Sequence, residues 1–200
     1  MTRLFTEGFE MGDVQNIRGS LEIRSTKRSG AYSAYANTLT ATKTGTISIN
    51  EISEIYFRAG LKKDVYASCT YSIEFRYDST GLIKIVKDGI NYDAYINNVK
   101  VADGSVDNLH EWCLLEIHIK IDDSDGIIQT KINGILDIDY SGDTKPDANT
   151  GINTVAFIGT CSYIDDIAIN DTNGSEDNSW CGDGHIIAIK PNANGDQSDL

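Results

Sequence analysis

The stretch Tyr71-Ser72-Ile73-Glu74-Phe75-Arg76-Tyr77-Asp78 decides the fold class, because apolar and polar side chains alternate through it residue by residue. The stretch from Leu115 to Ile121 repeats the pattern, with leucine and isoleucine at every second position and Glu116, His118 and Lys120 between them. A period of two buries one face of a strand and leaves the other in water, as in antiparallel sheets. Both stretches are therefore predicted to be strands, with His118 on the exposed side.

The rest of the chain extends this pattern in both directions. Turn residues separate short apolar runs, and the chain makes its turns with 18 glycines and only 2 prolines. About ten or more short strands with such turns are typical of a sandwich or barrel. No amphipathic helix of three turns is found, so we expect an all-β fold, an antiparallel jelly-roll sandwich. The further predicted strands are Glu54–Ala59, Leu82–Lys87, Ile90–Asn97, Ile127–Ile132, Leu136–Tyr140, Thr154–Ile158, Ile164–Ile169 and His185–Lys190.

The strand register of one hairpin can be predicted from the sequence. A two-residue loop at Asn133-Gly134 would pair Ile132 with Ile135 and mix the two faces of the strands. One extra residue, in the loop or as a bulge, keeps the apolar positions opposite one another. The predicted pairs are Ile132 with Leu136, Thr130 with Ile138, Ile128 with Tyr140 and, on the wet face, Lys131 with Asp137.

Residues 1–190 are expected to form a single jelly-roll domain, followed by a polar tail at 191–200. The segment from Asn170 to Gly184 is predicted to be a polar loop of unusual length. The four cysteines, Cys69, Cys113, Cys161 and Cys181, lie far apart and show no metal-ligand spacing. They are predicted to be reduced thiols packed in the protein, with Cys181 the most exposed of them.

The formal charge of −13 excludes partners that are mainly phosphate, because a nucleic-acid backbone requires clustered lysine and arginine. Anionic membrane surfaces are disfavoured for the same reason, and no stretch is long and apolar enough to span a bilayer. The N-terminus lacks the apolar region of a signal peptide. The sequence thus predicts a protein made in the cytoplasm, without membrane insertion, that leaves only as part of a larger particle.

Several segments resemble the laminin-G-like, concanavalin-A-like jelly roll: Phe9-Glu10, Arg28–Ser33, and Trp112 to Tyr140 with its Asn133-Gly134 turn. The segment from Tyr163-Ile164-Asp165-Asp166 through Asp171-Thr172 to Lys190-Pro191 resembles the ending of laminin-G-like structural proteins of tailed bacteriophages. The resemblance implies a virion protein, made in the host cytoplasm: a head decoration, fibre or tail accessory. Its expected partners are other capsid or tail proteins and further copies of itself, with a trimer favoured.

Asp165, Asp166 and Asp171 are the candidate metal ligands, because Ca²⁺ binds several oxygens and a polar loop follows the strand. On a regular strand Asp165 and Asp166 would point to opposite faces, so that at most one would join a given site. The alternative is that one carboxylate caps loop amides and the other is solvated. No other cofactor is expected.

Exposed aromatic rings are the candidate contacts with a glycan or a partner: Trp180 in the long loop, then Tyr95 and Tyr66. Alternatively, Trp180 holds that loop against the sandwich, and Trp112 is predicted to be in the core. Glu111, Glu116 and Asp122 do not reproduce the paired carboxylates of a glucanase, and no nucleophile motif occurs. The protein is therefore expected not to be an enzyme.

Two hypotheses remain. The first is a virion structural protein that assembles through edge strands and loops, with glycan adhesion as a further role. The second is a carbohydrate-binding module, with or without Ca²⁺. The bacteriophage resemblance favours the first, and an exposed aromatic platform would favour the second.

Overall fold

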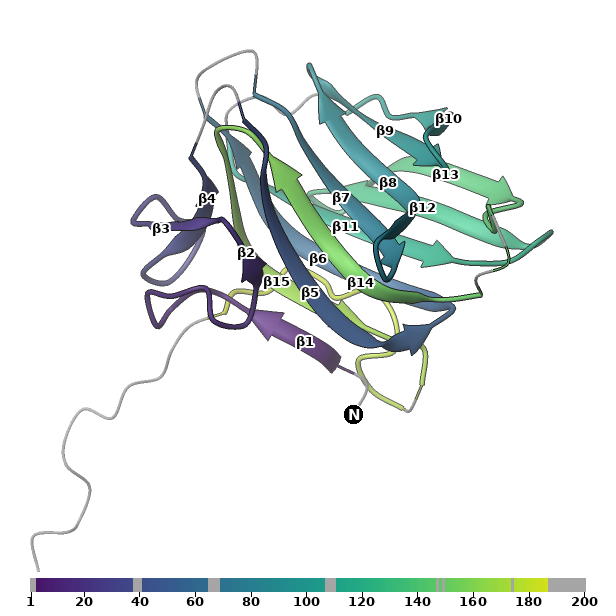
Figure 1. Ribbon diagram of the computed structural model, residues 1–200, viewed down its shortest axis with the longest axis horizontal. Helices are drawn as coiled ribbons and strands as arrows, with labels where there is room; N and C mark the ends of the chain where they lie inside the picture. Colours follow the sequence, from purple (N-terminus) through teal and green to yellow (C-terminus); the bar gives the residue numbers. More distant parts are fainter. Residues whose placement is uncertain are drawn as a thin grey trace, which may run out of the picture.

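The computed structural model describes residues 3–37, 41–64, 69–106, 111–146, 148, 150–173 and 175–186, and all regular structure in these residues is β (Figure 1). The strands in chain order are β1 (Arg3–Glu7), β2 (Arg18–Gly19), β3 (Glu22–Arg24), β4 (Ser33–Ala36), β5 (Lys43–Ile52), β6 (Glu54–Lys63), β7 (Tyr71–Tyr77), β8 (Thr80–Asp88), β9 (Asn91–Ile96), β10 (Val99–Asp103), β11 (Cys113–Lys120), β12 (Gly126–Ile132), β13 (Ile135–Gly142), β14 (Ile152–Gly159) and β15 (Ser162–Asn170). The all-β prediction is confirmed. Among the described residues no helix is long and apolar enough to cross a membrane.

The strands form two antiparallel sheets that lie face to face (Figure 1). The eight-stranded sheet has the order β13-β12-β11-β6-β15-β4-β3, and β1 also pairs with β15. The seven-stranded sheet has the order β10-β9-β8-β7-β14-β5-β2. The last two strands of the described residues, β14 and β15, thus occupy inner positions, one in each sheet.

The core lies between the sheets and consists of the inward-facing residues of both. Ile73 and Phe75 of β7 are 1% and 0% exposed, and Ile117 and Ile119 of β11 are 0% exposed. These four residues come from the two alternating stretches, so the inward face of each was correctly predicted. Close packing of such branched and aromatic side chains is the main source of stability in a sandwich.

The β12–β13 hairpin contains the predicted extra residue, but as a bulge within β13 and not in the turn. Thr130 pairs with Ile138 and Ile128 with Tyr140, as expected. Ile132 pairs with Ile135, and Lys131 lies opposite Leu136. The predicted pairs Ile132–Leu136 and Lys131–Asp137 are therefore wrong. Counted from the turn, the register shifts after the second pair, and Asp137 is left without a cross-strand partner.

Asp137 uses its bulged position to bind the segment that follows β10. Its Oδ1 accepts hydrogen bonds from the backbone amides of Ser105 (2.6 Å) and Val106 (2.8 Å). A carboxylate that accepts bonds from two amides stabilises their chain segment more than a neutral acceptor would. The bulge thus ties the edge strand of one sheet to the connection that leaves the edge strand of the other.

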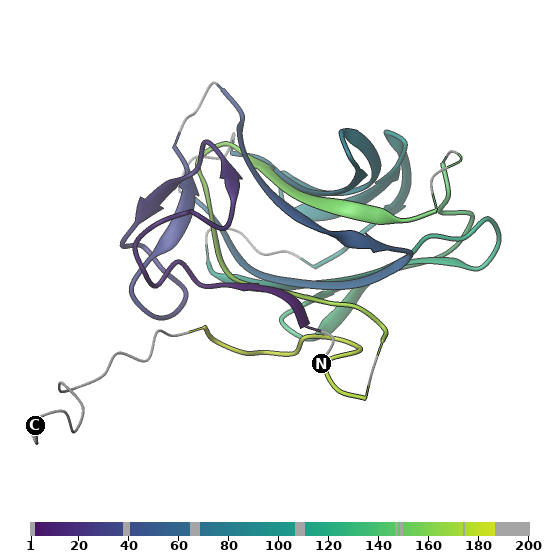
Figure 2. The same cartoon turned by 60° about the horizontal axis from the view of Figure 1, so that its bottom comes forward.

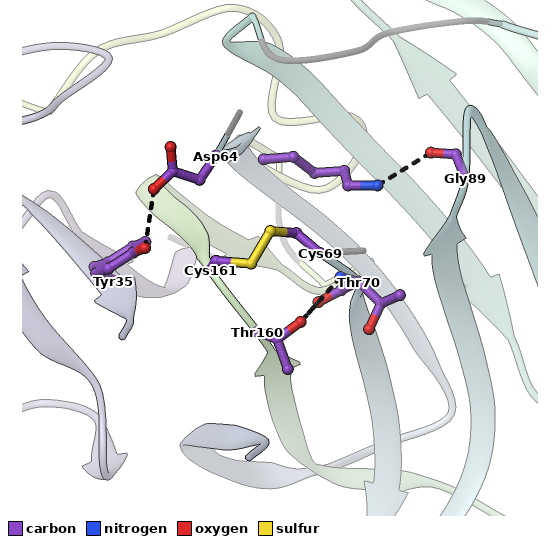
Figure 3. Close-up of a disulfide and its surroundings, with 8 residues drawn as sticks. Tyr35, Asp64, Cys69, Thr70, Gly89, Thr160 and Cys161 are labelled. Atoms are coloured by element: carbon purple, nitrogen blue, oxygen red, sulfur yellow. Dashed lines mark hydrogen bonds between the residues drawn. A yellow bond between two sulfur atoms is a disulfide. The ribbon is translucent and has the colours of Figure 1, made fainter. Parts of the chain in front are cut away.

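Cys69 and Cys161 form a disulfide, which corrects the prediction that all four cysteines are reduced (Figure 3). Both residues are buried, and their Cα atoms are 5.4 Å apart. The amide of Thr70 donates to Thr160 Oγ1 at 3.1 Å beside the bond. The disulfide therefore joins the residues that precede β7 and β15. The buried Cys113 and the half-buried Cys181 lie outside the disulfide.

Candidate functional site

The segment after β15 covers the outer face of the eight-stranded sheet, and Figure 2 shows it along the lower side of the molecule. The amide of Gly182 donates to Glu116 Oε1 at 2.8 Å, and Arg58 Nη1 donates to the Gly182 carbonyl at 3.0 Å. Arg58 and Glu116 are 3% and 4% exposed, although they lie on the outward side of their strands. We call residues 171–173 and 175–186 the strap. The described part of the predicted long loop is thus a covering layer without regular structure.

Trp180, the first candidate contact residue, holds the strap in place. Its ring meets Tyr56 and His118 edge-on, with centroids 5.7 and 5.9 Å away, and Lys131 Nζ lies 3.9 Å from its centroid. His118 stacks on Tyr56 at 4.2 Å and is 6% exposed, with Nε2 2.8 Å from Glu54 Oε1. The prediction of an exposed His118 is therefore wrong, because the strap shields that side of β11.

A bulge in β15 brings Asp165 and Asp166 to the same neighbouring segment. The register with β6 shifts between Asp165 and Ala168, and Asp166 has a φ of 49°. Asp165 Oδ2 accepts bonds from the amides of Arg28 (2.9 Å) and Ser29 (3.3 Å), while Asp166 Oδ1 accepts one from Ser29 Oγ at 2.7 Å. The expectation that the two carboxylates serve opposite faces is therefore wrong, since it assumed a regular strand.

These carboxylates are occupied by protein partners. Burial, together with the neighbouring Asp166 charge, raises the pKa of Asp165 to about 7. Asp166 Oδ2 forms an ion pair with Arg28 Nη1 at 2.9 Å, and its Oδ1 also accepts a bond from the Ile186 amide at 2.8 Å. The pair thus anchors the strap as well as the loop at Arg28.

The third candidate ligand, Asp171, binds its own loop: its Oδ1 and Oδ2 accept bonds from the backbone amide and side-chain amide of Asn173. In the described part of the chain no group of three or more His, Cys, Asp and Glu side chains could hold a metal ion. Asp165, Asp166 and Asp171 therefore do not fit a Ca²⁺ site as they stand. The capping alternative is confirmed for Asp165, which accepts loop amides, but its second half is wrong, because Asp166 is 0% exposed and not solvated.

The outer face of the seven-stranded sheet has no such covering from the strap. In Figure 1 this sheet is nearer the viewer, and no described residue after β15 crosses it. Cross-strand partners in register point to the same side of a sheet, so one continuous row can be followed across all seven strands. The row consists of Arg18, Thr46, Ala156, Glu74, Lys84, Tyr95 and Lys100. We call it the cross-strand row.

Tyr95, the second candidate contact residue, lies in this row on β9 and is half-buried. Lys84 Nζ lies 5.0 Å from its ring centroid and donates to Asn98 Oδ1 at 3.3 Å. A small recess beside the ring is lined by Glu74, Gly81, Leu82, Ile83, Lys84, Asn97 and Asn98. Amide, ammonium and carboxylate groups around an aromatic ring offer hydrogen bonds and an apolar surface to the same ligand.

The other aromatic predictions had mixed outcomes. Tyr66 lies outside the described residues. Trp112 is half-buried and packs against Tyr163, with ring centroids 6.1 Å apart. The prediction that Trp112 belongs to the core is therefore wrong. The functional groups that the sequence missed are the partners of Tyr95 in the row, above all Lys84 and Glu74. The alternation of β7 and β8 places them on the outward side, and only the strand order places them beside Tyr95.

No protein-family model matches the chain, and no curated protein matches it in sequence. Among solved structures it is similar to the endo-β-1,4-glucuronan lyase of Trichoderma reesei, with a TM-score of 0.58 and 11% identity over 86% of this chain and 96% of the lyase. The Ca²⁺/Man3GlcNAc-bound exoplasmic domain of VIP36 gives a TM-score of 0.55 and 13% identity, over 80% and 85%.

The carbohydrate-binding module CBM66 of Bacillus subtilis gives a TM-score of 0.51 and 10% identity, over 78% of this chain and 96% of the module. A sialidase also aligns, with a TM-score of 0.61 and 9% identity over 86% of this chain, which spans only 19% of the sialidase. At such identities the likeness concerns the fold alone. With its two antiparallel sheets and these neighbours, the chain has a jelly-roll fold of the concanavalin-A-like, lectin-like kind.

Proposed function

We propose that this protein is a non-enzymatic carbohydrate-binding module, and that it binds glycans on the outer face of the seven-stranded sheet. The observation that carries the proposal is the uncovered cross-strand row, in which the Tyr95 ring stands beside Lys84 and the Asn97-Asn98 turn. A sugar ring packs its C–H face on an aromatic ring, while its hydroxyls bond to the surrounding amide and charged groups.

The structural neighbours support this choice of ligand class. They are named as a glucuronan lyase, a carbohydrate-binding module and a domain with a bound mannose-containing oligosaccharide. The Cys69–Cys161 disulfide adds independent support, because such bonds persist in oxidising surroundings outside the reducing cytosol. Glycans of cell surfaces and of secreted polymers are met in the same surroundings.

Binding without catalysis agrees with how the face uses its charged groups. Glu74 pairs with Arg76 at 2.6 Å and Asp93 with Lys100 at 3.0 Å, so both carboxylates are engaged by cations of the same face. Glycoside hydrolysis requires one carboxyl group as acid and a second as nucleophile or base. On this face Glu74 and Asp93 are each held by a cation and do not form such a pair.

The test is a glycan array followed by calorimetry on the best ligand, with Tyr95→Ala and Trp180→Ala compared with the native protein. Loss of stacking on Tyr95 should weaken binding about fivefold to tenfold, since stacking of a sugar on one ring is worth roughly 1 to 1.4 kcal/mol. Trp180→Ala should leave the affinity unchanged. If Trp180→Ala weakened binding and Tyr95→Ala did not, the glycan would lie on the strap side and the proposed binding face would be refuted.

The second candidate is the virion structural protein, assembled with copies of itself or with other capsid or tail proteins. The resemblance of residues 163–191 to bacteriophage proteins favours it, as does the exposed apolar tip of the β12–β13 hairpin. Ile135 and Leu136 at that tip are 63% and 50% exposed, and exposed apolar groups commonly mark protein contacts. Light scattering on the purified protein and mass spectrometry of purified particles test it; a monomer absent from particles would refute it.

A further inference from the structure

Two cations on the outer face of the seven-stranded sheet already have a carboxylate partner. Arg76 pairs with Glu74, and Lys100 pairs with both Asp93 and Asp103. Such exposed pairs contribute little to stability, but they leave no free charge for a ligand. These pairs therefore act as a nearly neutral part of the surface.

Lys84 and Arg18 differ from these cations. Among the described residues no carboxylate lies within salt-bridge distance of either side chain: Glu74, directly opposite Lys84, is engaged by Arg76. Lys84 Nζ has only the Asn98 amide oxygen and the Tyr95 ring beside it, and Arg18 is exposed. Neither cation is neutralised by a described carboxylate, so both are available to an anionic ligand.

The two cations stand at the ends of a stretch of the row whose one charged residue, Glu74, is paired with Arg76. Arg18 is on β2 and Lys84 on β8, four strand spacings apart, which is about 19 Å along the sheet. Between them in the row lie Thr46, Ala156 and Glu74, and Ala156 is 0% exposed.

We propose that the ligand is an anionic polysaccharide of the uronate type, lying across the strands with one carboxylate at Lys84 and another at Arg18. This inference rests on the proposed glycan-binding function and specifies its ligand. One sugar ring packs on Tyr95, and the two cations select a polymer whose carboxylates recur along its length. A nucleic acid is disfavoured, because two cations cannot neutralise enough phosphates to offset the overall acidity.

The experiment compares two oligosaccharide series that differ only in the oxidation of C6: β-1,4-linked glucuronate oligomers and cello-oligosaccharides of the same lengths. Calorimetry is performed on the native protein, Arg18→Gln, Lys84→Gln and the double variant. Lys120→Gln, a cation on the other sheet, is the matched control. Each single variant should bind glucuronate oligomers about threefold to fivefold more weakly, the range of an exposed ion pair. The double variant should lose roughly tenfold, because sites this far apart add.

The outcomes separate the ligand class from the function. Tighter binding of the glucuronate series, lost in the double variant and in high salt, supports the inference. Equal binding of both series that still depends on Tyr95 overturns the uronate inference and leaves the carbohydrate-binding function intact. Absence of binding to both series and to the whole glycan array overturns both proposals.

Discussion

Removal of the Cys69–Cys161 disulfide is expected to cost a large share of the stability. The bond joins residues 92 positions apart, so it restricts nearly half of the unfolded chain. The loop-entropy relation gives about 4 to 5 kcal/mol for a loop of that length. For a domain of this size each kcal/mol lowers the melting temperature by about 2 to 4 °C, so the predicted fall is roughly 10 to 20 °C.

The assay is urea unfolding of Cys69→Ser/Cys161→Ser and of the native protein, followed by circular dichroism. Cys181→Ser is the matched control, because its thiol makes only weak 3.8 Å contacts with the carbonyls of Tyr56 and Ala168. Thiol titration of the native protein, denatured without reductant, should find two reactive thiols out of the 4 cysteines. Four reactive thiols, or a double variant within about 1 kcal/mol of the native protein, would refute the reasoning.

Three further predictions follow from the bulges and the strap. Trp180→Ala removes the ring contacts with Tyr56 and should speed hydrogen exchange at the Gly182 amide by about tenfold or more. This corresponds to a fall of about 1.5 to 2 kcal/mol in the free energy of local opening of the strap. Unchanged exchange would contradict the role of Trp180. The carboxyl carbon of Asp165 should titrate in NMR with a midpoint near 7, and a midpoint below 5 would contradict its burial. This pKa exceeds the ordinary 3.8, so the protonated Asp165 contributes to the free energy of unfolding. The contribution is fully present below about pH 4 and is lost as the pH rises through 7, at about 1.4 kcal/mol per pH unit. Asp137→Ala should lower the free energy of unfolding by about 2 to 4 kcal/mol, measured by thermal unfolding. Asp137→Asn should lower it less, because its amide oxygen can still accept a hydrogen bond from a backbone amide. Equal losses in the two variants would contradict this role of Asp137.

The sequence predicted the central strands well and the outer ones poorly. β7 and β11 alternate strongly because each puts a full apolar face into the core. The strand β5 was missed, since its apolar residues are interrupted by Gly45, where the side chains of Ile17 and Leu21 pack closely against the backbone. The edge strand β10 is half exposed and only 5 residues long, too short to establish a period of two.

The candidate site depended on information that local periodicity does not contain. Tyr95 could be selected as an accessible ring, but its neighbourhood with Lys84 and Arg18 follows from the order of strands in the sheet. The disulfide was missed for the same reason, because its cysteines are distant in sequence and meet only when β14 and β15 enter their sheets. The bulge at Asp166 changed the direction of one side chain, which a strict period of two cannot anticipate.

The inner position of the last two strands has a consequence for synthesis on the ribosome. β14 separates β7 from β5, and β15 separates β6 from β4, so a nascent chain that ends before residue 152 has neither sheet completed. Until then β5, β6 and β7 expose unpaired backbone groups and apolar faces to other chains in the cell. Folding therefore cannot proceed strand by strand from the N-terminus: it completes in one late step, and holding the unfinished chain apart from its neighbours is a task for the chaperones of the producing cell.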